Sequence, residues 1–396
     1  MRLVLNLSVA SILFKPLSTG AFKWKGEFTP QARGPQQYYR SEPLPLPSTV
    51  AGTLSGLLLE TFNKPLCGSG NEVYSNVYRG LNIAIVGKDV ATSPDIVLRG
   101  PYLYIKTSAE EKMLCSVYGI GSKLLCFTIG STGVHELEIH EWKHVTNIGI
   151  GLDSVKKTTI EGLIYTSTYH DIVATATDIV KRSALLKKGV KLEDYGILVE
   201  IYTKLGANVN RNVIFDTLKK TVDSKIVTLG GEFRAFQARV LNETFIDKLI
   251  SKIPSDKCLY WHIATPIMLC EEIVNEKSIL KEKEGKTFQG LLTEYAEKLL
   301  EKLLELMKLE KCSSEYLPKN VVNNAKIKFS VLGLGYDICL NKRRPMCRNV
   351  EPGSGLLGKP APNISPLEIY IKGVGSYSEL GWGTVIPLIE LKPHSK

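Results

Sequence analysis

Residues 1–14, MRLVLNLSVASILF, open the chain with apolar side chains at alternating positions. The alternation is carried by Leu3, Leu5, Leu7 and Val9, with Asn6 and Ser8 between them. A period of two residues is that of a β-strand. A basic residue followed by apolar ones also opens many signal peptides, but no small-residue cleavage site follows before Lys15. We therefore expect a first β-strand here and no leader.

A helix is predicted to begin at Ser48, which is a suitable N-cap residue after a proline-rich segment. Apolar residues then recur at helical spacing, at Val50, Leu54, Leu57 and Leu58. Gly52 and Gly56 leave one side of this helix flat, which favours close packing.

Further elements follow in an order that predicts an α+β protein. After the helix, β-prone stretches occupy residues 81–86, 96–105, 113–118 and 124–129. A strand, a helix and more strands are the order of a ferredoxin-like or RRM-like unit with insertions. Later strands are expected at 195–202, 225–229, 233–241, 257–264, 325–333 and 366–371, and helices at 210–221, 243–252 and 288–309. This second mixture predicts two related units, residues 1–170 and 171–396.

The charge balance favours a polyanionic partner. Among 396 residues, 50 are Lys or Arg and 40 are Asp or Glu, which gives a net charge of +10. Each cation placed on a phosphate releases a counterion, so a basic excess favours nucleic acid, although it also serves solubility. No apolar run reaches the ~18 residues of a membrane span, so no membrane partner is expected.

A long irregular segment from Lys15 to Pro47 mixes cations with aromatic side chains. Its aromatic residues are Phe22, Trp24, Phe28, Tyr38 and Tyr39, and its cations include Lys23, Lys25, Arg33 and Arg40. Single-stranded RNA needs both, because bases stack on rings while phosphates meet positive charge. A solvated loop whose rings pack locally is the alternative.

Three glycine-rich segments can bring the backbone close to a ligand: residues 225–234, 353–358 and 373–383. The first contains Gly230, Gly231 and Arg234, and ordinary turns are the alternative explanation for each segment. Near the second, no acidic residue interrupts a basic group, Lys342, Arg343, Arg344 and Arg348. This group is either a phosphate site or a solvated loop.

Catalytic and metal-binding patterns are weak. His135, His140 and His144 lie close together, and residues 140–144 (HEWKH) have the H-E-x-x-H spacing of a zincin motif, but three histidines and three acids within ten residues are more often a solvated surface. A phosphate-binding P-loop, a G-x-S-x-G elbow and a C-x-x-C pair are all absent. We therefore expect no metal and no cofactor.

The eight cysteines are dispersed along the chain. In a chain of this length, such dispersal is typical of a reducing compartment and buried free thiols, which predicts a cytoplasmic protein. A few disulfides remain possible in a hyperthermophile.

Short fragments, in order along the chain, resemble the third subunit of the type III-B (Cmr) CRISPR effector complex, within the RAMP superfamily. They span nearly the whole sequence: residues 46–54 (LPSTVAGTL), 99–101 (RGP), 149–153 (GIGLD), 161–166 (EGLIYT), 229–232 (LGGE), 264–266 (ATP) and 381–383 (GWG). Two features depart from the family's pattern: a charged stretch from Asp178 to Asp194, expected to be a helical insertion, and Phe233 after the glycine pair.

The resemblance implies two ferredoxin-like (RRM-like) RAMP domains and a non-catalytic role. Such a subunit grips the 5′ handle of crRNA, docks to the large polymerase/cyclase-like subunit beside a RAMP backbone subunit, and meets target RNA only indirectly. With the observations above, the residues expected to contact RNA are Lys23, Lys25, Arg33, Arg40, Ser48, Thr49, Gly230, Gly231, Arg234, Lys342, Arg343, Arg344, Arg348, Gly373, Gly375, Gly381, Trp382 and Gly383.

Two alternatives remain open. A related RAMP endoribonuclease processes the repeat transcript and needs a general acid–base pair, for which His170 near Tyr165 and Tyr169 is the candidate. The other alternative is the equivalent handle-binding subunit of another type III complex.

Overall fold

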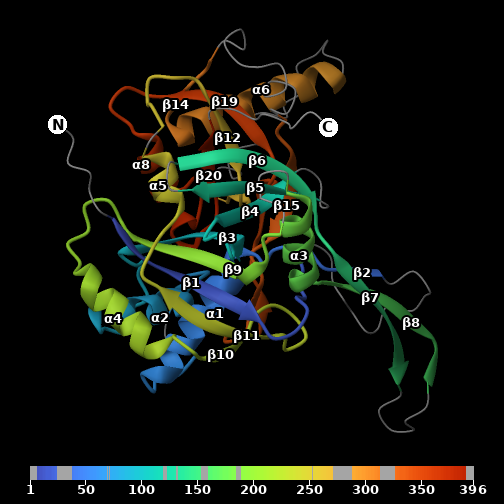
Figure 1. Cartoon of the computed structure of the whole chain (residues 1–396). Coiled ribbons are helices and arrows are strands. Elements are labelled where there is room, and N and C mark those ends of the chain that lie inside the picture. The colour runs from blue at the N-terminus through green and yellow to red at the C-terminus, as the bar shows by residue number, and fades with distance from the viewer. Residues whose placement is uncertain are drawn as a thin grey trace.

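A computed structural model describes most of the chain. The described residues are 7–24, 38–68, 70, 72–118, 123–130, 133–152, 159–183, 189–251, 253–270, 288–312 and 326–388. Strands dominate this part of the protein, with helices packed against them (Figure 1). No helix in the described ranges is long and apolar enough to cross a membrane.

The largest sheet has eight strands in the order β10-β11-β1-β9-β3-β4-β5-β6, with every neighbouring pair antiparallel. Their bounds are β1 Ser8–Pro16, β3 Ile96–Thr107, β4 Lys112–Tyr118, β5 Lys123–Gly130, β6 Gly133–Glu141, β9 Leu192–Thr203, β10 Ile226–Thr228 and β11 Ala235–Leu241. If β1, β3, β9 and β11 are numbered one to four along the chain, their order across the sheet is 4-1-3-2. Residues between β3 and β9 form an insertion that extends the sheet with β4, β5 and β6.

Helices cover one face of this sheet. They are α1 (Pro47–Thr61), α2 (Ser75–Val86), α3 (Ile172–Arg182) and α4 (Arg211–Thr221). Local sequence fixes their ends: Pro47 starts α1 with a φ already suited to a helix, and the Asn210 side chain caps α4 by accepting from the backbone N–H groups of Asn212 and Val213. Their apolar sides join β1, β3 and β9 in one hydrophobic core.

A second, four-stranded antiparallel sheet has the order β14-β19-β12-β20. Its elements are β12 (Leu259–Ile263), α6 (Phe288–Met307), β14 (Leu309–Glu310), β19 (Gly355–Pro360), α8 (Pro366–Lys372) and β20 (Val385–Leu388). Numbered along the chain, these strands also read 4-1-3-2, with one helix before the second strand and one before the fourth. Leu303 and Met307 of α6 pack on Trp261 of β12.

Smaller elements complete the described structure. β13 (Ile267–Leu269), β15 (Phe329–Gly333) and β18 (Met346–Val350) form one sheet, and β16 (Tyr336–Asp337) pairs with β17 (Lys342–Arg343). β2 (Tyr38–Arg40), β7 (His144–Leu152) and β8 (Thr159–His170) form an arm that projects from the body (Figure 1). The short helices are α5 (Ile246–Ile250) and η3 (Ser378–Leu380).

The two sheets share a core on the face of the large sheet opposite α1. Glu200 of β9 is fully buried there and accepts hydrogen bonds from the Tyr202 hydroxyl (2.8 Å) and the Tyr370 hydroxyl of α8 (2.6 Å). Its other oxygen accepts from the backbone N–H groups of Phe245 and Ile246 at the start of α5. A carboxylate buried in this way is supported by four donors, so it ties α5 and α8 to the large sheet.

The large sheet crosses the boundary predicted between residues 170 and 171. β9 lies between β1 and β3, and β11 lies on the other side of β1, so both strands after residue 171 belong to the first sheet. The expected α+β class agrees with the mixture of helices and antiparallel sheets.

Two predicted strands are helices. Residues 81–86 lie in α2, where all of the side chains up to Ile85 are buried, so their apolar run reflects burial on all sides and not a strand. Residues 366–371 lie in α8, because Ser365 accepts from the backbone N–H of Glu368 and Pro366 starts the helix. The expected helical insertion of residues 178–194 is instead the end of α3 and the start of β9, with 184–188 outside the described residues.

The expectation of buried free thiols is wrong. All eight cysteines form disulfides: Cys67–Cys339, Cys115–Cys126, Cys258–Cys312 and Cys270–Cys347. These pairs could not be predicted from the cysteine spacing, because three of them join segments that only the fold brings together. The cytoplasmic location stays a prediction.

Candidate nucleic-acid interface

The C-terminal glycine segment, predicted as an RNA-contacting loop, packs inside the protein. Gly381, Trp382 and Gly383 are buried, and Trp382 has no exposed surface. A Cβ on Gly375 would lie 2.4 Å from the Met268 carbonyl oxygen, and one on Gly381 would lie 2.9 Å from the Gly100 carbonyl oxygen. These glycines therefore serve close packing, and the expectation that they present a surface to RNA is corrected.

Arg99 explains why this segment is held so closely. Its guanidinium is fully buried and donates to the carbonyl oxygens of Leu98, Tyr370, Ile371 and Ser378, which include two of the last carbonyls of α8. Burial lowers the pKa of Arg99 to about 10. The side chain has a structural role, because its hydrogen bonds go to the backbone of its own chain.

Ser48 and Thr49 lie in the first turn of α1, but Ser48 is not the N-cap. The N-cap is Leu46, whose carbonyl accepts from the backbone N–H groups of Thr49 and Val50. The backbone N–H groups of Thr49 and Val50 are therefore already paired and are not available to a phosphate, contrary to the expectation from the sequence. The two hydroxyl-bearing residues instead line a cavity of about 280 Å³ on the side of α1.

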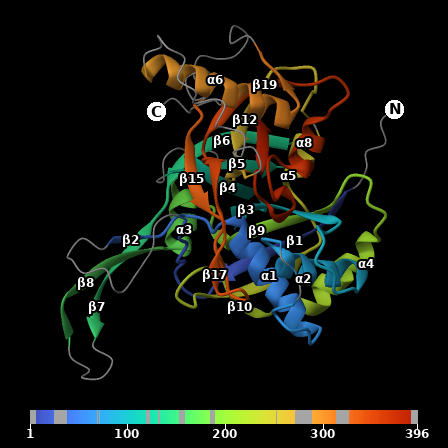
Figure 2. The ribbon, with the colours of Figure 1, turned by 180° about the vertical axis from the view of Figure 1, so that it is seen from behind.

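This cavity, called the α1 pocket, lies between α1 and the β16–β17 hairpin. Its lining comes from three segments: Ser48, Thr49, Gly52, Thr53 and Ser55; Leu66, Asn76 and Val77; and Leu334, Gly335, Tyr336, Asp337, Ile338, Cys339 and Arg344. Figure 2 shows the hairpin beside α1. The structure thus brings Arg344 to Ser48 and Thr49, which lie almost 300 positions away in the sequence.

Arg344 is the inner cation of this site. Its guanidinium lies 4.8 Å from the centre of the Tyr74 ring and 3.5 Å from a carboxylate oxygen of Asp337. Burial raises the pKa of the Tyr74 hydroxyl above its usual range, and that hydroxyl donates to the Leu334 carbonyl (3.0 Å). Arg344 therefore holds the hairpin against α2, and Asp337 offsets its charge.

Lys342 and Arg343 form β17 and are exposed, unlike Arg344. The disulfide Cys67–Cys339 fixes the turn of this hairpin to the segment that follows α1, with 5.3 Å between the two Cα atoms. Tyr336 is half exposed beside the pocket. The hairpin therefore carries two exposed cations on β17, the strand paired with the pocket-lining residues Tyr336 and Asp337.

The first glycine-rich segment also contacts α1. Thr53 of α1 donates through its hydroxyl to the Thr228 carbonyl (3.1 Å), and the Gly231 N–H donates to the Ala21 carbonyl (2.8 Å). Gly230 has φ +89°, and a Cβ there would meet the same carbonyl at 2.5 Å, so this glycine is required for packing. Phe233 is 90% exposed, which leaves its ring available for stacking.

Arg234 faces inward from this segment. Its guanidinium stacks over the Tyr169 ring at 4.2 Å and pairs with Glu232 at 3.0 Å. Phe233, and not Arg234, is therefore the exposed side chain at this place. Stacked and paired, Arg234 supports the loop.

Other predicted contacts are scattered or lie outside the described residues. Lys23 is partly buried, and desolvation lowers the pKa of its amine. Arg348 lies on β18, which belongs to the sheet β13-β18-β15 and not to the β16–β17 hairpin. Lys25 and Arg33 are outside the described residues, and only the backbone of Arg40 is described, in β2 paired with Thr168.

The acid–base alternative does not gain support from the geometry. His170 has no exposed surface, its Nε2 lies 2.9 Å from the Thr175 hydroxyl, and burial lowers its pKa to about 3. A histidine held in this way cannot exchange protons with a surface substrate near neutral pH. His140 and His144 lie on the strands β6 and β7 and not on a shared helix face, and the described residues contain no cluster suited to a metal ion.

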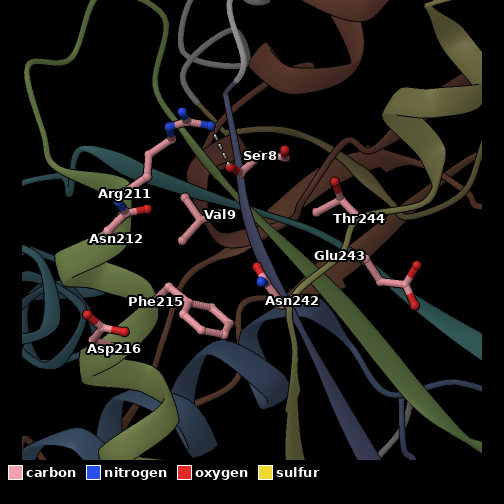
Figure 3. A pocket seen from close by; sticks show the side chains of 9 residues that line it. All are labelled: Ser8, Val9, Arg211, Asn212, Phe215, Asp216, Asn242, Glu243 and Thr244. Carbon is pink, nitrogen blue, oxygen red and sulfur yellow. Dashed lines mark hydrogen bonds between the residues drawn. The ribbon is translucent and has the colours of Figure 1, made fainter.

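A larger cavity of about 560 Å³ lies between β1, α4 and the loop after β11 (Figure 3). Arg211 projects over it and donates to the Ser8 carbonyl (3.3 Å), while Asp216 and Glu243 line other parts. No sequence pattern pointed to this cavity, because most of its residues are ordinary polar ones on separate elements. Two carboxylates against one arginine make it a poor site for a polyanion.

Comparison with known proteins adds limited information. No model of a known protein family matches the sequence, and no curated protein matches it. Among solved structures, the chain is similar to a chain of the Type III-B Cmr-beta bound to cognate target RNA, with 17% identity, a TM-score of 0.46, and coverage of 88% of this chain and 86% of that chain. A chain of the Type III-B Cmr-beta bound to cognate target RNA and AMPPnP gives 16% identity, a TM-score of 0.45 and the same coverage. TM-scores below 0.5 do not establish a shared fold, so the proposal below rests on the residues themselves.

Proposed function

We propose that this protein is a non-catalytic RNA-binding subunit of a type III-B (Cmr) CRISPR effector complex. It grips the 5′ handle of crRNA and docks to the large polymerase/cyclase-like subunit beside a RAMP backbone subunit. The family is suggested by the ordered sequence fragments. The RNA-binding role is supported by the surface over α1.

The observation that carries the RNA-binding proposal is the convergence of three sequence-distant segments around α1. The α1 pocket joins α1 to the hairpin that carries the exposed pair Lys342 and Arg343. Thr53 of α1 hydrogen-bonds to Thr228 of β10, the strand before the loop with the exposed Phe233. Cations that meet phosphates and rings that stack on bases are the two requirements of single-stranded RNA binding.

The fold proposal that accompanies this role is a pair of ferredoxin-like RAMP domains. Each sheet has the antiparallel order 4-1-3-2 with helices at matching places in the chain, which is the order of a ferredoxin-like unit. On this basis the first domain runs from β1 to β11 and the second from β12 to β20.

Binding of handle RNA by the full-length protein tests the role. The probe is crRNA with its repeat-derived 5′ segment, and the matched control is the same RNA with that segment removed. We expect clearly weaker binding of the control, measured by fluorescence anisotropy. Equal binding of both RNAs would contradict handle recognition.

The same samples test the non-catalytic role. Labelled repeat RNA is incubated with the protein, with and without divalent metal, and we expect it to stay intact. Cleavage that depends on His170 would favour the endoribonuclease. Co-purification from the source cells would then distinguish type III-B from another type III complex by the subunits that accompany the chain.

A further inference from the structure

The α1 pocket has the size of a site for one small ring-containing group. Its volume is about 280 Å³, just below the ~300–1,000 Å³ of common small-molecule pockets. Three separate segments build its walls, and the Cys67–Cys339 disulfide anchors the hairpin wall. Segments from three parts of the chain therefore meet at this pocket.

The lining suits a neutral, flat ligand better than a free phosphate. Arg344 is paired with Asp337, so the two charges within the pocket offset each other. The remaining polar groups are mostly hydroxyls and one amide, and the apolar part comes from Leu66, Val77, Leu334 and Ile338. A nucleobase with its ribose combines flat apolar faces with hydrogen-bonding edges, which matches such a lining.

The open space beside Gly52 favours a ligand that comes from outside the chain. It lies inside α1 and faces the pocket, and a Cβ there would have nothing within 4 Å. Glycine within a helix costs about 0.5–1 kcal/mol relative to alanine, and at Gly52 no internal packing explains it. Gly80 of α2 shows the contrast, because a Cβ there would meet the Ser55 carbonyl oxygen at 2.5 Å.

We propose that the α1 pocket holds one unstacked nucleobase and its ribose from the bound RNA. The base lies against Tyr336, the ribose approaches the α1 backbone at Gly52 near Thr49, and the adjoining phosphates lie outside the pocket toward Lys342 and Arg343. This inference rests on the proposed RNA-binding function and adds a specific subsite to it.

Substitutions at two glycines of the same helix test the subsite in the full-length protein. Gly52→Ala and Gly52→Leu place side chains in the pocket, whereas Gly56→Ala makes the same change in helix propensity one turn away and outside the pocket lining. We expect all three variants to fold, with Gly52→Ala melting no lower than the wild type, because open space surrounds that position. A melting temperature of Gly52→Ala well below the wild type would overturn the open-pocket geometry.

Binding of single-stranded crRNA across a range of salt concentrations gives the decisive readout. Gly52→Leu is expected to weaken binding at least about tenfold, the loss of one base-stacking contact, without changing the salt slope, because a base carries no charge. Gly56→Ala is expected to bind as the wild type does. Wild-type affinity in Gly52→Leu would overturn the subsite while leaving RNA binding intact, and a wild-type protein that binds no RNA would overturn both proposals.

Discussion

At the residue scale, glycines with the same appearance in the sequence have opposite roles in the structure. Gly375 and Gly381 fill places where a side chain would collide with the backbone, whereas Gly52 faces open space. Nothing in the sequence separates them, because the distinction depends on which distant segment lies opposite each glycine. The C-terminal segment therefore looked like a ligand loop although its partner is the protein itself.

Gly375→Ala and Gly381→Ala are expected to destabilise the protein. Both positions have positive φ, +82° and +95°, and both would place a Cβ against a carbonyl oxygen. We expect each to lower the free energy of unfolding by about 1–3 kcal/mol. Gly206→Ala is the control, since its φ is +81° with nothing within 4 Å, so it reports the conformational cost alone. If urea denaturation gives all three variants the same free energy of unfolding, the packing role of Gly375 and Gly381 is contradicted.

Glu200 is expected to make stability depend on pH. Burial raises its pKa to about 7 from a usual value of 4.5, so the folded state holds the proton more tightly than the unfolded state. This contribution to stability is fully present below pH 4.5 and is lost as the pH rises through 7. Relative to Glu200→Gln, wild-type stability should fall across this window by at most about 1.4 kcal/mol per pH unit, measured by chemical denaturation. A difference in unfolding free energy between wild type and Glu200→Gln that stays the same at every pH would contradict the raised pKa of Glu200.

At the element scale, strands with clear alternation or isolated apolar runs were predictable, and helices buried on several sides were not. β3, β4, β5 and β9 were predicted within a few residues, as were α4 and α6. α8 was missed because Ile369 and Ile371 favour a strand locally, whereas its capping residues and burial decide for a helix. β7 and β8 carry no strong pattern, since they form a projecting arm and not a core.

The β16–β17 hairpin divides its cations by role, which predicts different effects of mutation. Lys342→Ala with Arg343→Ala should weaken RNA binding and flatten the salt slope by about 1.4, at about 0.7 for each single-strand phosphate contact. Arg344→Ala should mainly lower the melting temperature, because its guanidinium stacks on Tyr74 and pairs with Asp337. An unchanged slope in the double variant would show that these two cations do not touch RNA.

At the scale of the whole molecule, the pairing of strands that are distant in the sequence determines which fragments of the chain can fold in isolation. The fragment of residues 1–170 lacks β9 and β11, which are both neighbours of β1 in the large sheet. Strands without partners expose unpaired backbone groups, so we expect this fragment to be unfolded or aggregated. A dispersed amide NMR spectrum from the isolated fragment would contradict the shared sheet. This pairing was not visible in the sequence, because the insertion between β3 and β9 separates β9 and β11 from β1 along the chain.

The most direct test of the account is where the RNA lies on the protein. crRNA carrying 4-thiouridine in its repeat-derived 5′ segment is crosslinked to the full-length protein, and the crosslinked peptides are identified by mass spectrometry. We expect crosslinks in peptides that contain Tyr336 or Phe233, because both rings are exposed and belong to segments that contact α1. Crosslinks confined to the cavity near Arg211, or to the C-terminal glycine segment, would contradict the proposed RNA-binding surface around α1.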